Sequence, residues 1–164
     1  MEIGRDRYVV VFALMELIPL RLQPGDDLRQ ALESWVQGPA GGLAWVVSGI
    51  GSLTVGQLRL AGRSVHTVLK GDLERLTLQG SLCSDGSHLH ITVADAHGSV
   101  LGGHLCAGSL VRTTAEMLIA RLPQWQRRRV LDPSTRYLEL QISPRPSRSC
   151  LLRWREWCSR SVDR

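Results

Sequence analysis

Short segments in which apolar and polar residues alternate occur along most of the chain, and this pattern indicates β-strands. The first apolar segment covers 8–22. Pro19 within it marks a sheet edge or a bulge, because proline cannot donate a hydrogen bond to a neighbouring strand. Further segments are predicted as strands at 43–50, 53–60, 65–69, 73–79, 88–94, 99–106, 115–122 and 137–142. Glycine-containing breaks separate most of them, which is typical of a sheet whose strands are joined by hairpins.

A single helix is predicted over about 27–37, directly after the turn-forming pair Pro24-Gly25. Asp26 or Asp27 can cap its first turn. Four apolar side chains spaced at i, i+4, i+7 and i+8 form one stripe along it, namely Leu28, Leu32, Trp35 and Val36. One helix among many strands predicts an α+β fold with a mainly antiparallel sheet and one or two flanking helices.

The 164 residues suffice for one domain with a hydrophobic core. Apolar residues make up 43% of the chain and charged residues 21%, a composition that argues against disorder. We expect a domain over 1–142 and a tail over 143–164 that is rich in arginine and tryptophan. The stretch LLRWREW at 151–157 can form a short second helix. This tail either packs on the domain or on a partner chain, or its tryptophans stack on nucleic-acid bases.

The sequence indicates neither a membrane span nor export. No apolar run reaches the length of about 18 residues that a membrane-spanning helix needs. The apolar run at 8–15 has a faint likeness to a signal peptide. Glu16 interrupts it and no small-residue cleavage site follows, so a buried strand is the stronger interpretation. The four cysteines include no CxxC pair, which favours reduced thiols and a cytoplasmic location.

The net charge of +5 is unevenly distributed along the chain. Residues 1–120 carry nine basic and eleven acidic side chains, whereas residues 121–164 carry eleven arginines and four acidic side chains. Attraction to nucleic acid would therefore come chiefly from the C-terminal quarter. The arginines that we expect to contact phosphates are Arg127, Arg128, Arg129, Arg145, Arg148, Arg153 and Arg155.

Three histidines are predicted to lie close together on one face of the sheet. His88 and His90 alternate along one predicted strand, so both imidazoles point to the same side. The sequence DAHG at 95–98 favours a tight hairpin turn between this strand and the next. Extended along the two strands, the register of that turn sets His90 opposite His104, and His88 opposite Cys106.

These histidines suit a metal ion. Neutral imidazole is a favoured nitrogen ligand of zinc, and three imidazoles leave a fourth coordination position open. Cys106 is an additional candidate ligand, although a buried cysteine is more often part of the packing. The alternative for the histidines is a structural role, either exposed to solvent or hydrogen bonded.

No catalytic motif is recognisable elsewhere in the chain. It contains no Walker-type phosphate loop, no GxSxG nucleophile turn and no GxGxxG fingerprint. The remaining carboxylates are isolated in the sequence, and we assign no catalytic residue.

Several motifs resemble the plant and prokaryote conserved (PPC) domain and occur in that family's order. They are LQPGDDL at 22–28, SGIGSL at 48–53, GDLERL at 71–76, and LH at 89–90 followed by GGHL at 102–105. TAE at 114–116 and YLEL at 137–140 are similar to the family's closing segments. The domain also occurs in plant AT-hook nuclear proteins. This chain lacks an AT-hook motif and resembles the prokaryotic type.

The resemblance implies an α+β domain that assembles as a homotrimer, with a zinc ion at His88, His90 and His104. It also implies DNA binding or transcriptional regulation. The matched core is acidic, so we expect DNA binding through the tail that is weak and independent of sequence. The segment that contacts partner proteins in the plant family corresponds to Gly71, Asp72, Leu73, Glu74, Arg75 and Leu76. The alternative function is a zinc-dependent enzyme or a small-molecule sensor that uses the open zinc position.

Overall fold

The structure is a computed structural model that describes residues 15–38 and 42–145. It contains eight strands and one helix in those ranges. They are β1 (Glu16–Leu22), α1 (Leu28–Gln37), β2 (Ala44–Arg59), β3 (Thr67–Leu82), β4 (His88–Ala94), β5 (Val100–Leu105), β6 (Leu110–Arg121), β7 (Trp125–Leu131) and β8 (Leu138–Pro144). This arrangement confirms the predicted α+β fold. The predicted segment at 151–157 and the first part of the predicted strand at 8–22 lie outside the described residues.

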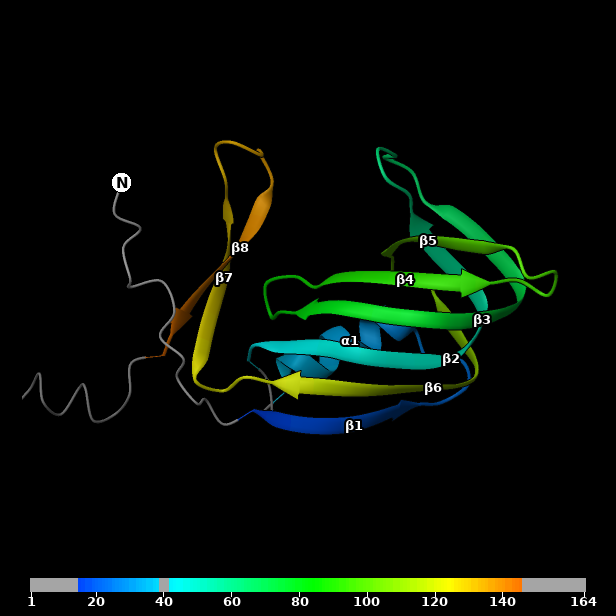
Figure 1. The fold of residues 1–164 in the computed structure, drawn as a ribbon, viewed down its shortest axis with the longest axis horizontal. Coiled ribbons are helices and arrows are strands. Elements are labelled where there is room, and N and C mark those ends of the chain that lie inside the picture. The colour runs from blue at the N-terminus through cyan, green and yellow to red at the C-terminus, as the bar shows by residue number, and fades with distance from the viewer. Residues whose placement is uncertain (1–14, 39–41, 146–164) are drawn as a thin grey trace, which may run out of the picture.

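Six strands form one antiparallel sheet in the order β1-β6-β2-β3-β4-β5 (Figure 1). The end of β2 also pairs with β5, through Leu58 with Leu105 and Arg59 with His104. Strands β2 to β5 therefore close into a small barrel, and the first half of β2 extends it toward β6 and β1. β7 and β8 form a separate two-stranded hairpin that stands away from the end of the sheet (Figure 1).

One helix covers the core face of the sheet. Asp27 caps α1, since its carboxylate accepts hydrogen bonds from the backbone N–H of Arg29 and Gln30 at 3.0 and 3.1 Å. The same carboxylate accepts a 2.6 Å hydrogen bond from the Gly108 N–H, which ties the helix start to the loop before β6. The apolar side of α1 packs into a core built mainly of leucine, valine and isoleucine, including Leu32, Leu53, Leu58, Leu78, Leu89, Ile91, Val111 and Ile119.

Two predicted pairs of strands are each one long strand in the structure. The segments 43–50 and 53–60 join as β2, and 65–69 and 73–79 join as β3. Gly51 lies inside β2, where a Cβ atom would come within 2.2 Å of the Thr114 carbonyl oxygen. Glycine at this position therefore permits a close approach of β6 rather than ending a strand.

Pro19 lies on β1, which is an edge strand, as its position in the sequence predicted. The residues that the structure describes include no helix that is both long and apolar enough to cross a membrane. β7 was not predicted as a strand, because its three consecutive arginines resemble a solvated segment.

Candidate metal centre

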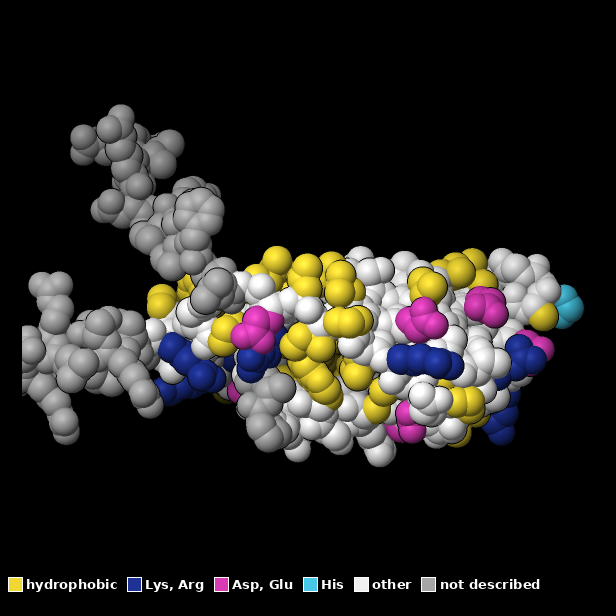
Figure 2. Space-filling view, turned by 90° about the horizontal axis from the view of Figure 1, so that it is seen from below, with side chains coloured by type: hydrophobic (Ala, Val, Ile, Leu, Met, Phe, Trp, Pro, Cys, Tyr) yellow, Lys and Arg dark blue, Asp and Glu magenta, His cyan; other side chains and the backbone are white. Residues whose placement is uncertain are grey.

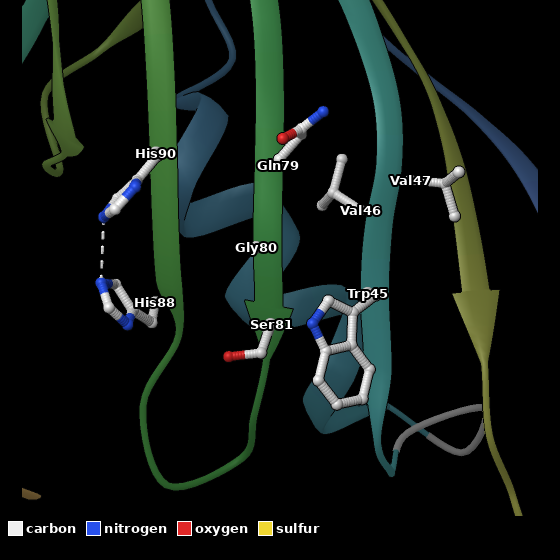
Figure 3. Close-up of a pocket in the computed structure, with 8 residues that line it drawn as sticks. All are labelled: Trp45, Val46, Val47, Gln79, Gly80, Ser81, His88 and His90. Carbon is white, nitrogen blue, oxygen red and sulfur yellow. Dashed lines mark hydrogen bonds between the residues drawn. The ribbon is translucent and has the colours of Figure 1, made fainter. Parts of the chain in front are cut away.

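His88 and His90 from β4 and His104 from β5 form a compact group on the outer surface of the sheet. Their nearest candidate ligand nitrogens all lie within 4.8 Å of one another. The Nε2 atoms of His88 and His90 are 3.1 Å apart, and the ring centres of His90 and His104 are separated by 4.6 Å. Figure 3 shows His88 and His90 projecting from β4 in the same direction, with α1 behind the sheet. No other group among the described residues brings three metal-ligating side chains together.

The register that brings the histidines together is the predicted one. The Asp95 N–H donates to the Ser99 carbonyl, and the Asp95 carboxylate accepts from the N–H groups of His97 and Ser99. This turn sets β4 against β5 so that His90 pairs directly with His104. Local turn chemistry therefore brings together two histidines that are fourteen residues apart in the sequence.

Two glycines allow the strands to approach at this site: Gly80, which the sequence did not single out, and Gly103 of the GGHL motif. A Cβ on Gly80 of β3 would lie 2.0 Å from the carbonyl oxygen of His88. A Cβ on Gly103 of β5 would lie 2.8 Å from the carbonyl oxygen of Arg59 on β2. The close approach of β3 to β4 helps to position His88, and the close approach of β5 to β2 helps to position His104. Gly102, two residues before His104 in the GGHL motif, has only ordinary contacts at 3.4 Å.

Cys106 lies outside the histidine group. The β4–β5 ladder ends at the pair His90 and His104, and the Cys106 N–H donates instead to the Gln57 carbonyl of β2 at 2.9 Å. Its thiol is buried, 3.7 Å from the carbonyl oxygen of His104. The expected pairing of His88 with Cys106 does not form, because the chain beyond His104 pairs with β2 instead of β4.

The environment favours the neutral form of two of the imidazoles, because it lowers the pKa of each. Partial burial lowers the pKa of His88, and His90 and Arg129 lower it further, while Glu139 on β8 opposes them. Burial likewise lowers the pKa of His104, with Arg59 as the next largest cause. Neutral imidazole is the form that binds a metal ion, so the site favours the ligating state.

The donor set fits zinc. Two nitrogen ligands of one tetrahedral zinc ion lie about 3.3 Å apart, since each zinc–nitrogen bond is about 2.0–2.1 Å. The separation of 3.1 Å between the Nε2 atoms of His88 and His90 is close to this value. Three imidazoles would leave a fourth position for water or a ligand.

Hollows border the histidine group on both sides. One, of about 440 Å³, lies on β2, β3 and β4 and is lined by Trp45, Gln79, Ser81, His88 and His90 (Figure 3). The other, of about 1050 Å³, includes His88 and His104 and extends to the β7–β8 hairpin. Both hollows give a ligand access to the histidines.

The expected partner-contact segment lies in β3, with its side chains divided between the two faces. Leu73 and Arg75 are buried. The Arg75 guanidinium donates to the carbonyl oxygens of Ile50 and Glu116, and burial lowers its pKa to about 10. Arg75 thus links β3 to β2 and β6. The side chains of this segment that reach solvent are Asp72, Glu74 and Leu76, beside the exposed backbone of Gly71.

The arginines expected to contact nucleic acid have different roles in the structure. Arg129 donates to Gly86 O, Leu138 O and Ser81 Oγ, each at 3.2 Å, and its backbone N–H donates to the Asp85 carboxylate. Arg127 donates to the Gly42 carbonyl at 2.8 Å. These two arginines therefore attach the hairpin to the domain, whereas Arg128 and Arg145 are exposed. Arg148, Arg153 and Arg155 lie outside the described residues.

Comparison with known sequences gives two kinds of match. The profile of the Plants and Prokaryotes Conserved (PCC) domain family matches residues 11–123. A Synechococcus protein (strain JA-2-3B'a(2-13)) named bifunctional protein GlmU is 48% identical over 130 residues, which are 79% of this chain and 21% of that protein. The chain thus spans about a fifth of the length of the curated relatives it matches.

Solved structures share the fold. A hypothetical protein from Salmonella cholerae-suis has 39% identity and a TM-score of 0.78, over 81% of this chain and 96% of that one. A metal-containing protein from Archaeoglobus fulgidus has 23% identity and a TM-score of 0.66, over 77% and 93% of the two chains. A protein from Ralstonia eutropha described as a candidate DNA-binding protein has 24% identity and a TM-score of 0.64, over 76% and 90%.

Proposed function

The chain belongs to the Plants and Prokaryotes Conserved (PCC) domain family, and on this premise we propose that it is a cytoplasmic, trimeric, zinc-binding regulatory protein that associates with DNA. The observation that carries the proposal is the group His88, His90 and His104, whose nitrogens lie within 4.8 Å of one another. A relative of the same fold is described as containing a metal, which supports the metal part of the proposal.

The three imidazoles would hold the ion, and the zinc would supply a Lewis-acidic position for water or a ligand. His88 and His104 face the larger hollow, and His88 and His90 face the smaller one. The protein contributes neutral nitrogen donors held in place by the β4–β5 ladder. Because these donors project from paired strands rather than from loops, the site is pre-organised.

Metal content tests this part directly. Purified full-length protein should contain close to one zinc ion per chain, measured by elemental analysis. His90→Ala should lose it, since two imidazoles bind zinc weakly. His97→Ala is the matched control, because His97 lies on the exposed turn outside the group and should leave zinc content unchanged. Full zinc retention by His90→Ala would remove the basis of the proposal.

A homotrimer is proposed because much apolar surface is exposed on the single chain. Exposed apolar side chains on β1, β2 and β3 include Leu17, Val47, Ile50, Val68 and Leu76. Figure 2, which views the chain from the β1 side, shows apolar patches between a few charged groups. Contacts between copies would cover such patches. Light scattering should give about three times the chain mass, and a monomer at micromolar concentration would contradict the trimer.

DNA association is proposed to come from the C-terminal arginines, since candidate DNA-binding proteins share the fold and the core is acidic. Replacing Arg148, Arg153 and Arg155 by glutamine in the full chain should weaken binding to a short duplex at low salt and reduce the salt dependence. Arg63→Gln, which removes an exposed arginine in the loop between β2 and β3, is the control for loss of charge outside the tail. Equal binding by wild type and the triple variant would contradict the tail as the DNA-binding segment.

A small-molecule sensor is the second candidate function, and the larger hollow favours it. A volume of about 1050 Å³ beside two of the three histidines would accommodate a small organic molecule.

Regulatory partner proteins would bind the exposed part of the 71–76 segment of β3, through Asp72, Glu74 and Leu76.

A further inference from the structure

The hollow between the β7–β8 hairpin and the end of the barrel is unusually rich in arginine. Its lining includes four arginines, contributed by α1, β2, β7 and the β7–β8 turn: Arg29, Arg59, Arg129 and Arg136. Two carboxylates also line it, Asp85 and Glu139. The lining therefore has an excess of positive charge before any metal ion is counted.

Two of the four arginines are fully engaged in holding the structure together. Arg29 forms an ion pair with Glu33 at 2.9 Å and donates to the carbonyl oxygens of Leu105 and Ser87. Arg129 donates to two carbonyl oxygens and to a serine hydroxyl, as described above. Both guanidiniums have protein acceptors, so neither needs a ligand.

The other two arginines lack such partners. Within the described residues, the side chains of Arg59 and Arg136 make no hydrogen bond or ion pair with the protein. Arg59 lies beside His104 in the β2–β5 ladder and is half-buried. Arg136, in the turn between β7 and β8, lines the same hollow and is exposed. The two guanidiniums are therefore available to an anion bound in this hollow.

The backbone at Arg136 is held in a costly conformation. Its φ of 61° is in the left-handed region, and it is the only described residue other than glycine with a positive φ. The Arg136 N–H donates to Asp132 O, and the Asp132 N–H donates to Tyr137 O, so the turn fixes this conformation. Glycine would adopt it without strain. A role for the side chain would account for arginine at a position that glycine would occupy with less strain.

We propose that this hollow binds a small organic phosphate ester, whose phosphate lies between Arg59 and Arg136. Guanidinium groups recognise phosphate oxygens through paired charge-assisted hydrogen bonds. The organic part would lie against the exposed apolar side chains of Leu131, Tyr137 and Leu138, which line the same hollow. The inference deepens the sensor function proposed above, because His88 and His104 border the site and a zinc ion there would add positive charge.

The test is calorimetric titration of the full-length, zinc-analysed protein with phenyl phosphate and, separately, with inorganic phosphate. Phenyl phosphate should bind more tightly, because its ring covers apolar surface. Arg59→Gln and Arg136→Gly should each weaken binding of both probes by about tenfold or more, the loss expected for a charged hydrogen-bonding group. Arg128→Gln is the matched control, since Arg128 is exposed on the same hairpin and does not line the hollow.

Arg136→Gly separates ligand binding from folding. Because glycine relieves the left-handed strain, this variant should keep or raise the melting temperature while it loses affinity for phosphate. Unchanged affinity in Arg136→Gly, or equal losses in Arg136→Gly and Arg128→Gln, would overturn the assignment. Displacement of phenyl phosphate by an equimolar short DNA duplex would also overturn it, by assigning the hollow to nucleic acid.

Metal analysis keeps the two proposals distinguishable. A zinc-containing protein that binds neither probe contradicts the phosphate site alone. A protein that binds phenyl phosphate in an Arg59- and Arg136-dependent manner but contains no zinc contradicts the metal site and supports the phosphate site.

Discussion

The barrel and the β7–β8 hairpin are both antiparallel β-structure, yet different forces hold them. The barrel strands bury a continuous set of leucine, valine and isoleucine side chains against α1. No residue of β7 or β8 is fully buried. The hairpin is attached by hydrogen bonds from Arg127 and Arg129 to backbone and hydroxyl oxygens of the domain. Hydrophobic burial therefore stabilises the barrel, and charge-assisted hydrogen bonds attach the β7–β8 hairpin to it.

This difference separates the two candidate sites. The histidines project from strands of the well-packed barrel, whereas the wall that carries Arg136 belongs to the hairpin. A metal ion would therefore bind to the well-packed barrel. An organic ligand would also contact the hairpin, which can open locally. Variants that loosen the hairpin should therefore leave the histidine group intact.

The largest expected effect is on the barrel core. Leu78 of β3 is completely buried, and Leu78→Ala should lower the free energy of unfolding by about 2–5 kcal/mol through lost burial and a cavity. Val130→Ala on β7 is the matched change in the hairpin, where the side chain is 36% exposed, and should cost less than about 0.5 kcal/mol. Denaturant titration of both variants measures the contrast. Similar losses would show that the hairpin shares the core's packing.

Detaching the hairpin should have the next largest effect. Arg129→Ala removes three hydrogen bonds from a guanidinium group and should cost about 1–3 kcal/mol. Amide hydrogen exchange should accelerate in β7 and β8 while protection in β4 persists. Zinc content should be unchanged. Arg128→Ala should alter neither quantity, and faster exchange throughout the barrel in Arg129→Ala would contradict independent attachment.

Removal of the helix cap should have a smaller effect. Asp27→Ala deprives two helix N–H groups and the Gly108 N–H of their acceptor, and should destabilise the protein by about 1 kcal/mol. Asp26→Ala should cost less, because the Asp26 carboxylate accepts from the Gln23 N–H and does not cap the helix. Thermal unfolding compares the two, and a larger loss for Asp26→Ala would reassign the cap.

The smallest effect concerns thiol reactivity and leaves stability unchanged. Burial raises the pKa of Cys83 to about 11, an effect that Arg127 partly opposes. At pH 7 the thiolate fraction, and hence the alkylation rate, should be about a hundredfold below that of an ordinary cysteine. Peptide mapping after iodoacetamide treatment measures this rate. Rapid labelling of Cys83 in the folded protein would contradict its burial.

Much of the fold follows from local patterns in the sequence. The apolar stripe of α1, its Asp27 cap and the turn at Asp95 are short-range signals, and they predict the helix, the hairpin and the pairing of His90 with His104. The closure of the barrel at Arg59 was not predictable, because it depends on contact between strands distant in sequence. Gly51 and Gly80 resemble breaks in the sequence, but in the structure they lie inside strands and allow neighbouring strands to approach closely.

The strand at 137–142 was predicted and forms β8, but its partner β7 was missed for a related reason. Its arginines resemble a solvated, nucleic-acid-binding run, and only the positions of Ser81, Asp85 and Gly86 show what Arg129 binds. A sequence shows that a residue is an arginine, but it does not show which group accepts the hydrogen bonds of that arginine. The candidate phosphate site lies between these distant segments, so no local motif could have indicated it.

X-ray absorption spectroscopy at the zinc edge tests the central claim most directly. The full-length protein should show three nitrogen neighbours with the multiple-scattering pattern of imidazole at about 2.0–2.1 Å, and one further light atom. A sulfur neighbour near about 2.3 Å would assign Cys106 to the site and contradict its position outside the histidine group. Zinc without imidazole neighbours, or no zinc in the folded protein, would contradict the metal centre at His88, His90 and His104.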